Sequence, residues 1–138
     1  MPCDCPSSGA PRVREDARPG ELCPWTRLQG STGTTVVTQP SAEWVDAKDF
    51  IGALVGIDVR DYSSDVRIYV QTSNTLDDAS FVDLINHRPT VAGRKYFKLL
   101  PTDTTPLLRY VRWKAGNATA AWRAQFRIVA NFKSRDGR

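Results

Sequence analysis

Apolar and polar residues alternate most clearly in the last third of the chain. The apolar members of this run occupy every second position: Trp122, Ala124, Phe126, Ile128, Ala130 and Phe132. This period of two is typical of a strand with one buried face and one solvent face. The preceding run, Leu107–Ala115, is rich in aromatic and β-branched residues, and the short segment Gly116–Thr119 separates the two. We therefore expect one long antiparallel hairpin from Leu107 to Phe132, central to a sheet.

Two further alternating runs lie in the middle of the chain. Gly52–Arg60 places four apolar residues on one face: Ala53, Val55, Ile57 and Val59. After the turn residues Asp61–Asp65, three apolar residues alternate with polar ones: Val66, Ile68 and Val70. The proximity of the two runs in sequence predicts a second hairpin.

The remaining segments also favour strands. Ser31–Gln39 is dense in β-branched residues and ends at Pro40, while Phe81–Leu84 and Arg94–Leu100 are short strand candidates. Ser41–Phe50 fits either a short helix or an extended segment, and the closely flanking strands favour the extended one. About seven or eight short strands with little helix indicate an all-β fold, an antiparallel β-sandwich or jelly roll.

The first 32 residues differ from the rest of the chain. They contain five prolines, and no apolar periodicity is visible among them. A segment of this kind gains too little from burial to fold alone, so we expect an extended arm with Trp25 and Leu28 as its large apolar anchors. The expected organisation is an arm over residues 1–32, a sandwich domain over 33–133 and a charged tail over 134–138.

Composition limits the classes of partner. The chain has 138 residues, a formal net charge of +4 and 41% apolar residues, which suits one soluble domain. Lysines and arginines are spread along the chain without a run of five, so a nucleic-acid partner is not expected. No stretch approaches the ~20 apolar residues of a membrane span, and the N-terminus does not read as a secretory signal. We therefore expect neither a membrane association nor export by that route.

All three cysteines lie near the N-terminus: Cys3, Cys5 and Cys23. Reduced thiols are the favoured interpretation, and a disulfide from Cys23 to Cys3 or Cys5 is an alternative. A metal site is a weaker alternative, because Cys-x-Cys followed by a lone cysteine lacks the paired Cys-x-x-Cys spacing of zinc modules. We expect no cofactor.

Catalytic patterns are sparse. His87 is the single histidine, no Gly-x-Ser-x-Gly elbow accompanies it, and we expect it on a surface loop. Carboxylates gather at two turns, where such residues usually bond their own backbone: Asp58, Asp61, Asp65, Asp77 and Asp78. A calcium ion held by these loops is a minor alternative. Asn117-Ala-Thr119 fits a glycosylation sequon but is better explained as the hairpin turn. We expect a protein that is not an enzyme.

The polar face of the predicted sheet is the remaining candidate site. If the alternation holds, seven side chains share one solvent surface: Arg67, Tyr69, Gln71, Arg123, Gln125, Arg127 and Asn131. Arginine and tyrosine are enriched at protein interfaces, so this face, together with Trp25 and Leu28 of the arm, is the candidate interface. A plain wet face and a surface for sugars or nucleic acid remain the alternatives.

Two segments carry a resemblance to a known group of proteins. Arg109–Lys114 followed by Ala124–Ile128, and Val66–Ser73 followed by Asp77-Asp78, resemble strands of small jelly-roll proteins from tailed bacteriophages and related particles. Galactose-binding-like and discoidin-like modules share this style of ending. The resemblance implies a decoration, capsid-associated or tail protein, made in the bacterial cytoplasm and built into the virion as a homo-oligomer or lattice subunit.

A carbohydrate-binding β-sandwich module is the alternative function, with a glycan as partner. It requires aromatic side chains exposed on one face, and four are candidates: Trp44, Tyr69, Tyr110 and Trp113. Of these, Trp113 is expected to face the core with Val111.

Overall fold

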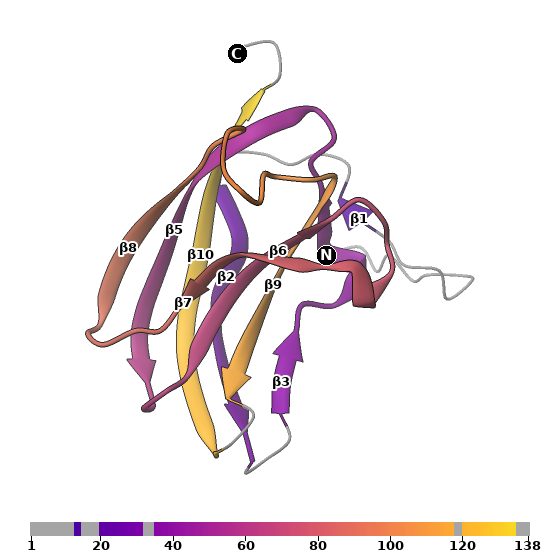
Figure 1. Cartoon of the computed structure of the whole chain (residues 1–138). Coiled ribbons are helices and arrows are strands. Elements are labelled where there is room, and N and C mark those ends of the chain that lie inside the picture. Colours follow the sequence, from indigo (N-terminus) through magenta and orange to yellow (C-terminus); the bar gives the residue numbers. More distant parts are fainter. Residues whose placement is uncertain (1–12, 15–19, 32–34, 118–119, 135–138) are drawn as a thin grey trace, which may run out of the picture.

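The computed structural model describes residues 13–14, 20–31, 35–117 and 120–134, which form two sheets packed face to face (Figure 1). Sheet A runs in the order β1 (Val13–Arg14), β4 (Trp44–Asp46), β9 (Tyr110–Asn117), β6 (Arg67–Ser73) and β7 (Val82–His87), and β3 (Thr35–Thr38) also pairs with β9. Sheet B runs in the order β2 (Gly20–Gly30), β10 (Trp122–Ser134), β5 (Phe50–Tyr62) and β8 (Gly93–Leu99). The described residues also include two 3₁₀ turns, Ser41–Glu43 and Asp78–Ser80.

Strand pairing is nested from the ends of the chain inward. β2 pairs with β10, β3 and β4 pair with β9, β5 pairs with β8, and β6 pairs with β7, all antiparallel. The pairs β5–β10 and β6–β9 then join these units into two sheets, and β1 adds a short parallel pair at β4. This nested order is that of a jelly roll. The predicted all-β antiparallel sandwich is therefore confirmed.

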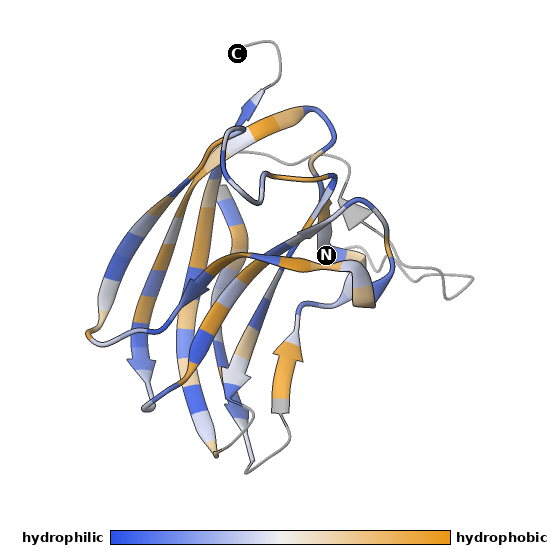
Figure 2. Ribbon diagram, in the orientation of Figure 1, coloured by the Kyte–Doolittle hydropathy of each residue, from blue (hydrophilic) through white to orange (hydrophobic). Residues whose placement is uncertain are grey.

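The core lies between the sheets and is supplied by the predicted alternation. Sheet B contributes Ala53, Val55, Ile57 and Val59 from β5 and every second residue of β10 from Trp122 to Ala130, and all of them are buried. Sheet A contributes Ile68, Val70, Val111 and Trp113. The rings of Trp113 and Phe126 meet edge to face across the two sheets, with centroids 5.5 Å apart. Figure 2 shows the alternation of apolar and polar residues along these strands.

The predicted hairpins are wrong. β9 and β10 belong to different sheets, as do β5 and β6. Each connection therefore crosses from one layer of the sandwich to the other. An alternation of period two determines which side chains of a strand face the core. The alternation is the same whether the next strand pairs with this one or belongs to the opposite sheet, so it does not predict a hairpin. The central position of these strands is confirmed, because β9 and β10 each have a partner on both sides.

The expected arm over residues 1–32 is wrong for Gly20–Gly30, which form β2 along β10. Leu22 and Cys23 of this strand are both buried in the core. Register shifts at Phe126/Ile128 and Ile128/Val129 interrupt the pairing, and such bulges destroy the alternation that would have identified the strand. Residues 1–12 and 15–19 of the expected arm, and 135–138 of the expected tail, lie outside the described residues.

The other predicted segments need smaller changes. The extended interpretation of Ser41–Phe50 is confirmed, because a single 3₁₀ turn leads into β4 and β5 begins at Phe50. The first strand candidate shortens to β3, and the candidates at Phe81 and Arg94 become β7 and β8. His87 ends β7 and is half-buried, so the expectation of a surface loop is wrong.

Candidate functional site

The seven residues predicted to share one polar surface belong to two different sheets, whose outer faces lie on opposite sides of the sandwich. β6 belongs to sheet A and β10 to sheet B, so Arg67 and Tyr69 are separated from the candidates on β10, which are Arg123, Gln125, Arg127 and Asn131. Gln71 is buried, with 4% of its surface exposed. Of the two anchors expected in the arm, Trp25 lies beside the β10 set, whereas Leu28 packs against the core. The expectation of a single shared surface is therefore wrong.

The outer face of sheet B brings together residues from all four of its strands, and Trp25 is its aromatic centre. Thr26 pairs with Phe126 and Cys23 with Ile128, so both Pro24 and Trp25 lie opposite Arg127 in a bulge. The guanidinium of Arg60 stacks 3.9 Å from the Trp25 ring, and that of Arg127 lies 5.2 Å from it. Both contacts are cation–π interactions, which hold the indole in one orientation on the surface.

A ladder of ion pairs crosses this face between β10, β5 and β8. Asp58 accepts from Arg94 at 3.0 Å and from Arg127 at 3.4 Å, while Arg123 pairs with Asp61 at 2.9 Å. The hydrogen bond from Arg123 lowers the pKa of the Asp61 carboxyl below its usual value, with the Arg123 charge adding to the effect. These contacts fix the arginine side chains in place, so a partner would meet an ordered surface.

An apolar strip runs beside the ladder around Gly56. A Cβ at this position would meet Val129 Cγ2 at 3.0 Å and Tyr96 Cε1 at 3.1 Å, so the glycine allows both side chains to approach the strand closely. Tyr96 is 55% exposed and Leu54 is 41% exposed. The outer face of sheet B thus combines exposed aromatic and aliphatic groups with fixed arginines.

The outer face of sheet A is instead covered at one end by the segment before β7. Arg112 is buried there, with 4% of its surface exposed, and its guanidinium stacks 4.0 Å from the Phe81 ring. It donates to Gln71 Oε1 at 2.9 Å and forms an ion pair with Asp78. A second small core surrounds it, formed by Trp44, Phe81 and Tyr110 with Leu76 packed against them.

Three of the four aromatic residues that were candidates for a carbohydrate-binding surface are buried. Trp44 and Tyr110 are buried in the small core, and Trp113 is buried in the main core with Val111, as expected. Tyr69 remains half-exposed beneath Lys114, whose Nζ lies 4.7 Å from the ring centroid. Of these four residues, Tyr69 is therefore the one that a ligand could contact in the described fold.

The candidate carboxylates serve turns and ion pairs. Asp77 Oδ1 accepts from the Ala79 backbone N–H at 3.3 Å, and Asp65 pairs with Arg88. The remaining three pair with arginines as described: Asp58, Asp61 and Asp78. Within the described ranges no group of three or more His, Cys, Asp or Glu residues could hold a metal ion.

Cys23 is the one cysteine of the chain within the described residues, and it carries a free thiol. Burial raises its pKa to about 11, while the hydrogen bond with the Thr26 hydroxyl, 3.4 Å away, acts in the opposite direction. Cys3 and Cys5, the other proposed metal or disulfide residues, lie outside the described residues.

We predict that Cys23 is unreactive in the folded protein. At pH 8 a thiol of pKa about 11 is almost entirely protonated, and thiolate is the nucleophile in alkylation. Iodoacetamide should therefore label the Cys23 peptide slowly in buffer and rapidly in guanidinium chloride, as measured by peptide mass spectrometry. Equal labelling rates in the two conditions would show that the thiol is accessible in the native fold.

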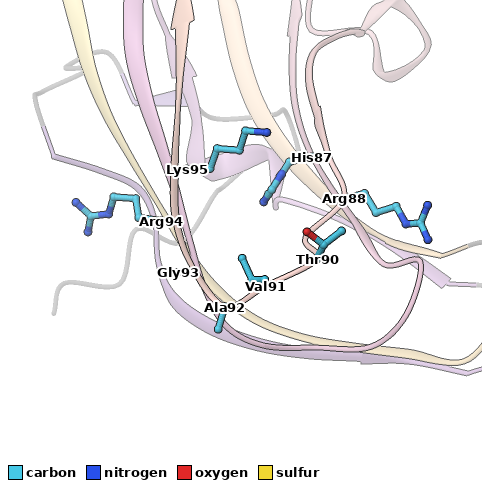
Figure 3. A pocket seen from close by; sticks show the side chains of 8 residues that line it. All are labelled: His87, Arg88, Thr90, Val91, Ala92, Gly93, Arg94 and Lys95. Atoms are coloured by element: carbon cyan, nitrogen blue, oxygen red, sulfur yellow. The ribbon is translucent and has the colours of Figure 1, made fainter.

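A pocket of about 250 Å³ lies where β7 ends and β8 begins (Figure 3). Its lining comprises His87, Arg88, Thr90, Val91, Ala92, Gly93, Arg94 and Lys95. The His87 ring meets Phe97 edge to face at 5.6 Å. Burial lowers the pKa of His87 below its usual value of 6.5, and the charge of Lys95 lowers it further.

The helical segments within the described ranges include none that is long and apolar enough to cross a membrane. Comparisons of the chain with protein-family models, with curated proteins and with solved structures found no match.

Proposed function

We propose that this protein is a non-enzymatic structural subunit of a phage or phage-like particle, either a capsid decoration protein or a tail protein. In this proposal its copies assemble through the outer face of sheet B. The observation that supports it best is the Trp25 ring, held between the guanidinium groups of Arg60 and Arg127. Tryptophan, tyrosine and arginine are the residue types that dominate binding energy at protein interfaces. Here they are exposed or half-exposed on one ordered face.

The jelly-roll fold is compatible with a structural subunit of a particle. Jelly rolls recur in viral capsid proteins, but they also recur in lectins and other proteins, so the fold alone does not define a function. The phage assignment depends on the resemblance carried by Arg109–Lys114, Ala124–Ile128 and Val66–Ser73. Apart from Arg109 and Val66, which precede β9 and β6, these residues belong to β9, β10 and β6, which are central strands of the two sheets.

The residues that precede β2 are included in the proposal as a second assembly element. The reason is their proline-rich composition; residues 1–12 and 15–19 themselves lie outside the described residues. A truncation that tests this must spare β2, because Leu22 and Cys23 belong to the core. Removal of residues 1–12 meets this condition, whereas removal of 1–30 would delete a strand of sheet B.

Sedimentation equilibrium over a range of protein concentrations tests the assembly. The measured mass of the wild-type protein should exceed the monomer mass of 15.4 kDa. The double variant Trp25→Ser/Tyr96→Ser should associate only at concentrations at least tenfold higher. Tyr69→Ser is the matched control, because Tyr69 lies on the outer face of sheet A. A wild-type chain that stays monomeric at every concentration, or a control that is equally impaired, would contradict assembly through sheet B.

A further inference from the structure

The pocket at the junction of β7 and β8 is lined by four basic side chains and by no acidic one. Two of the four are already engaged elsewhere. Arg88 pairs with Asp65, and Arg94 pairs with Asp58 on the outer face of sheet B. Figure 3 shows both arginines extending away from the pocket on opposite sides. The basic groups left to face the pocket are therefore His87 and Lys95.

His87 and Lys95 occupy positions that point between the sheets. His87 pairs with Ile68 in sheet A, and Lys95 pairs with Ile57 in sheet B. Directly paired residues project on the same side of a sheet, and both isoleucines are fully buried in the core. Two inward positions at the edge of the sandwich thus carry a half-buried histidine and an exposed lysine.

The surroundings of these two side chains offer no carboxylate. Phe97 contacts both: its ring centroid lies 5.6 Å from that of His87 and 5.6 Å from Lys95 Nζ. Among the described residues, Lys95 forms no ion pair within 4 Å. Asp65 and Asp58, the acidic partners of the pocket arginines, are engaged by Arg88 and Arg94. Lys95 therefore repels an imidazolium at His87, and an anion between the two would remove this repulsion.

We propose that this pocket binds an anionic oxygen group, a phosphoryl or carboxylate group, between His87 and Lys95. Thr90 also lines the pocket and carries a hydroxyl, and Val91 and Ala92 contribute exposed apolar groups to the lining (Figure 3). This site is separate from the outer face of sheet B and does not depend on the assembly proposed above.

The single histidine of the chain makes the test direct, because the imidazole Hε1 signal in the NMR spectrum comes from His87 alone. The pKa of His87 is measured in chloride, sulfate and acetate at equal ionic strength. Sulfate stands for a phosphoryl group and stays doubly charged throughout the titration. A bound anion stabilises the imidazolium, so we expect the pKa of His87 to rise by roughly one unit relative to chloride.

Two lysine variants separate binding from general salt effects. Lys95→Gln should raise the pKa of His87 in chloride, because the repelling charge is gone, and should cut the further rise in sulfate or acetate by at least half. Lys98→Gln is the matched control on the same strand, since Lys98 pairs with the exposed Leu54 and points away from the pocket. It should behave as the wild type in all three salts.

Each outcome decides the proposal. A larger rise in sulfate assigns the pocket to phosphoryl groups, and a larger rise in acetate assigns it to carboxylates. Equal pKa values in all three salts would overturn the proposal. So would an unchanged response in Lys95→Gln, which would leave Lys95 only the role of an inward charge that protects an edge strand from pairing with other chains.

Discussion

Replacing Phe126 with alanine is expected to destabilise the protein by about 3–5 kcal/mol, which is the usual cost of truncating a fully buried phenylalanine. Phe126 has no exposed surface, and its ring packs edge to face on Trp113 of the opposite sheet. The substitution therefore opens a cavity at the contact between the two layers. Against a typical total stability of about 5–15 kcal/mol, the loss is a large fraction of the free energy of unfolding.

Urea unfolding followed by tryptophan fluorescence measures the change at a fixed protein concentration, which keeps any self-association constant. Phe126→Leu retains most of the apolar volume and should cost less, about 1–2 kcal/mol. Gln125→Ala is the control, because Gln125 is the preceding residue on β10 and points to the outer face, so its effect should stay within about 0.5 kcal/mol. Similar losses for Phe126→Ala and Gln125→Ala would mean that the two sheets do not pack as described.

Alternation along single strands could be predicted from the sequence, because it is a local property of the extended backbone. It identified the inward residues of β5, β6 and β10 correctly. Strand pairing could not be predicted, since it depends on which distant strand lies alongside. The bulged strand β2 was missed because Pro24 and consecutive buried residues, Leu22 and Cys23, break the period.

In the candidate site, too, the orientation of side chains along one strand could be predicted, whereas the neighbouring strands could not. Arg123, Gln125 and Arg127 were placed correctly on the solvent side of β10. Asp58, Arg60 and Tyr96 were missed as members of this face, because no local pattern shows that β5 lies beside β10 and β8 beside β5. A usable signal was present at Gly56, since a glycine inside a strand often marks a close approach of neighbouring groups. The presence of His87 and Lys95 in one pocket also could not be predicted, because their strands, β7 and β8, belong to opposite sheets.

Arg112 illustrates a further limit. The alternation of β9 assigns it to solvent, because Val111 and Trp113 face the core. The segment before β7 nevertheless folds over the sheet and buries it against Phe81 and Trp44. A cation buried in this way requires partners, and it finds them in Gln71 and Asp78. The structure thus makes Arg112 the connection between sheet A and its covering segment.

Replacing Arg112 with alanine should cost about 2–4 kcal/mol, because it leaves a cavity beside the Trp44 and Phe81 rings and removes the donor to the buried Gln71 side chain. The cost of the lost ion pair is modest, since the Asp78 side chain is 80% exposed and water can solvate it when the arginine is absent. Arg112→Lys keeps the charge without the planar group that stacks on Phe81, so it should be intermediate. Hydrogen exchange should also accelerate between Asn74 and Phe81, where the covering segment loses its anchor.

Arg123→Ala provides the matched control for this prediction. Arg123 also pairs with an aspartate, and its Nε lies 2.9 Å from Asp61 Oδ2, but its side chain is 55% exposed on the outer face of sheet B. Exposed ion pairs of this kind contribute less than about 1 kcal/mol. The free energies of unfolding of the two variants, measured in urea, compare an arginine–aspartate pair with a buried arginine and one with an exposed arginine. If Arg112→Ala cost no more than Arg123→Ala, the stacking of Arg112 on Phe81 and its bond to Gln71 would contribute nothing to stability, and the covering segment would have to be held by its own apolar contacts through Leu76 and Phe81.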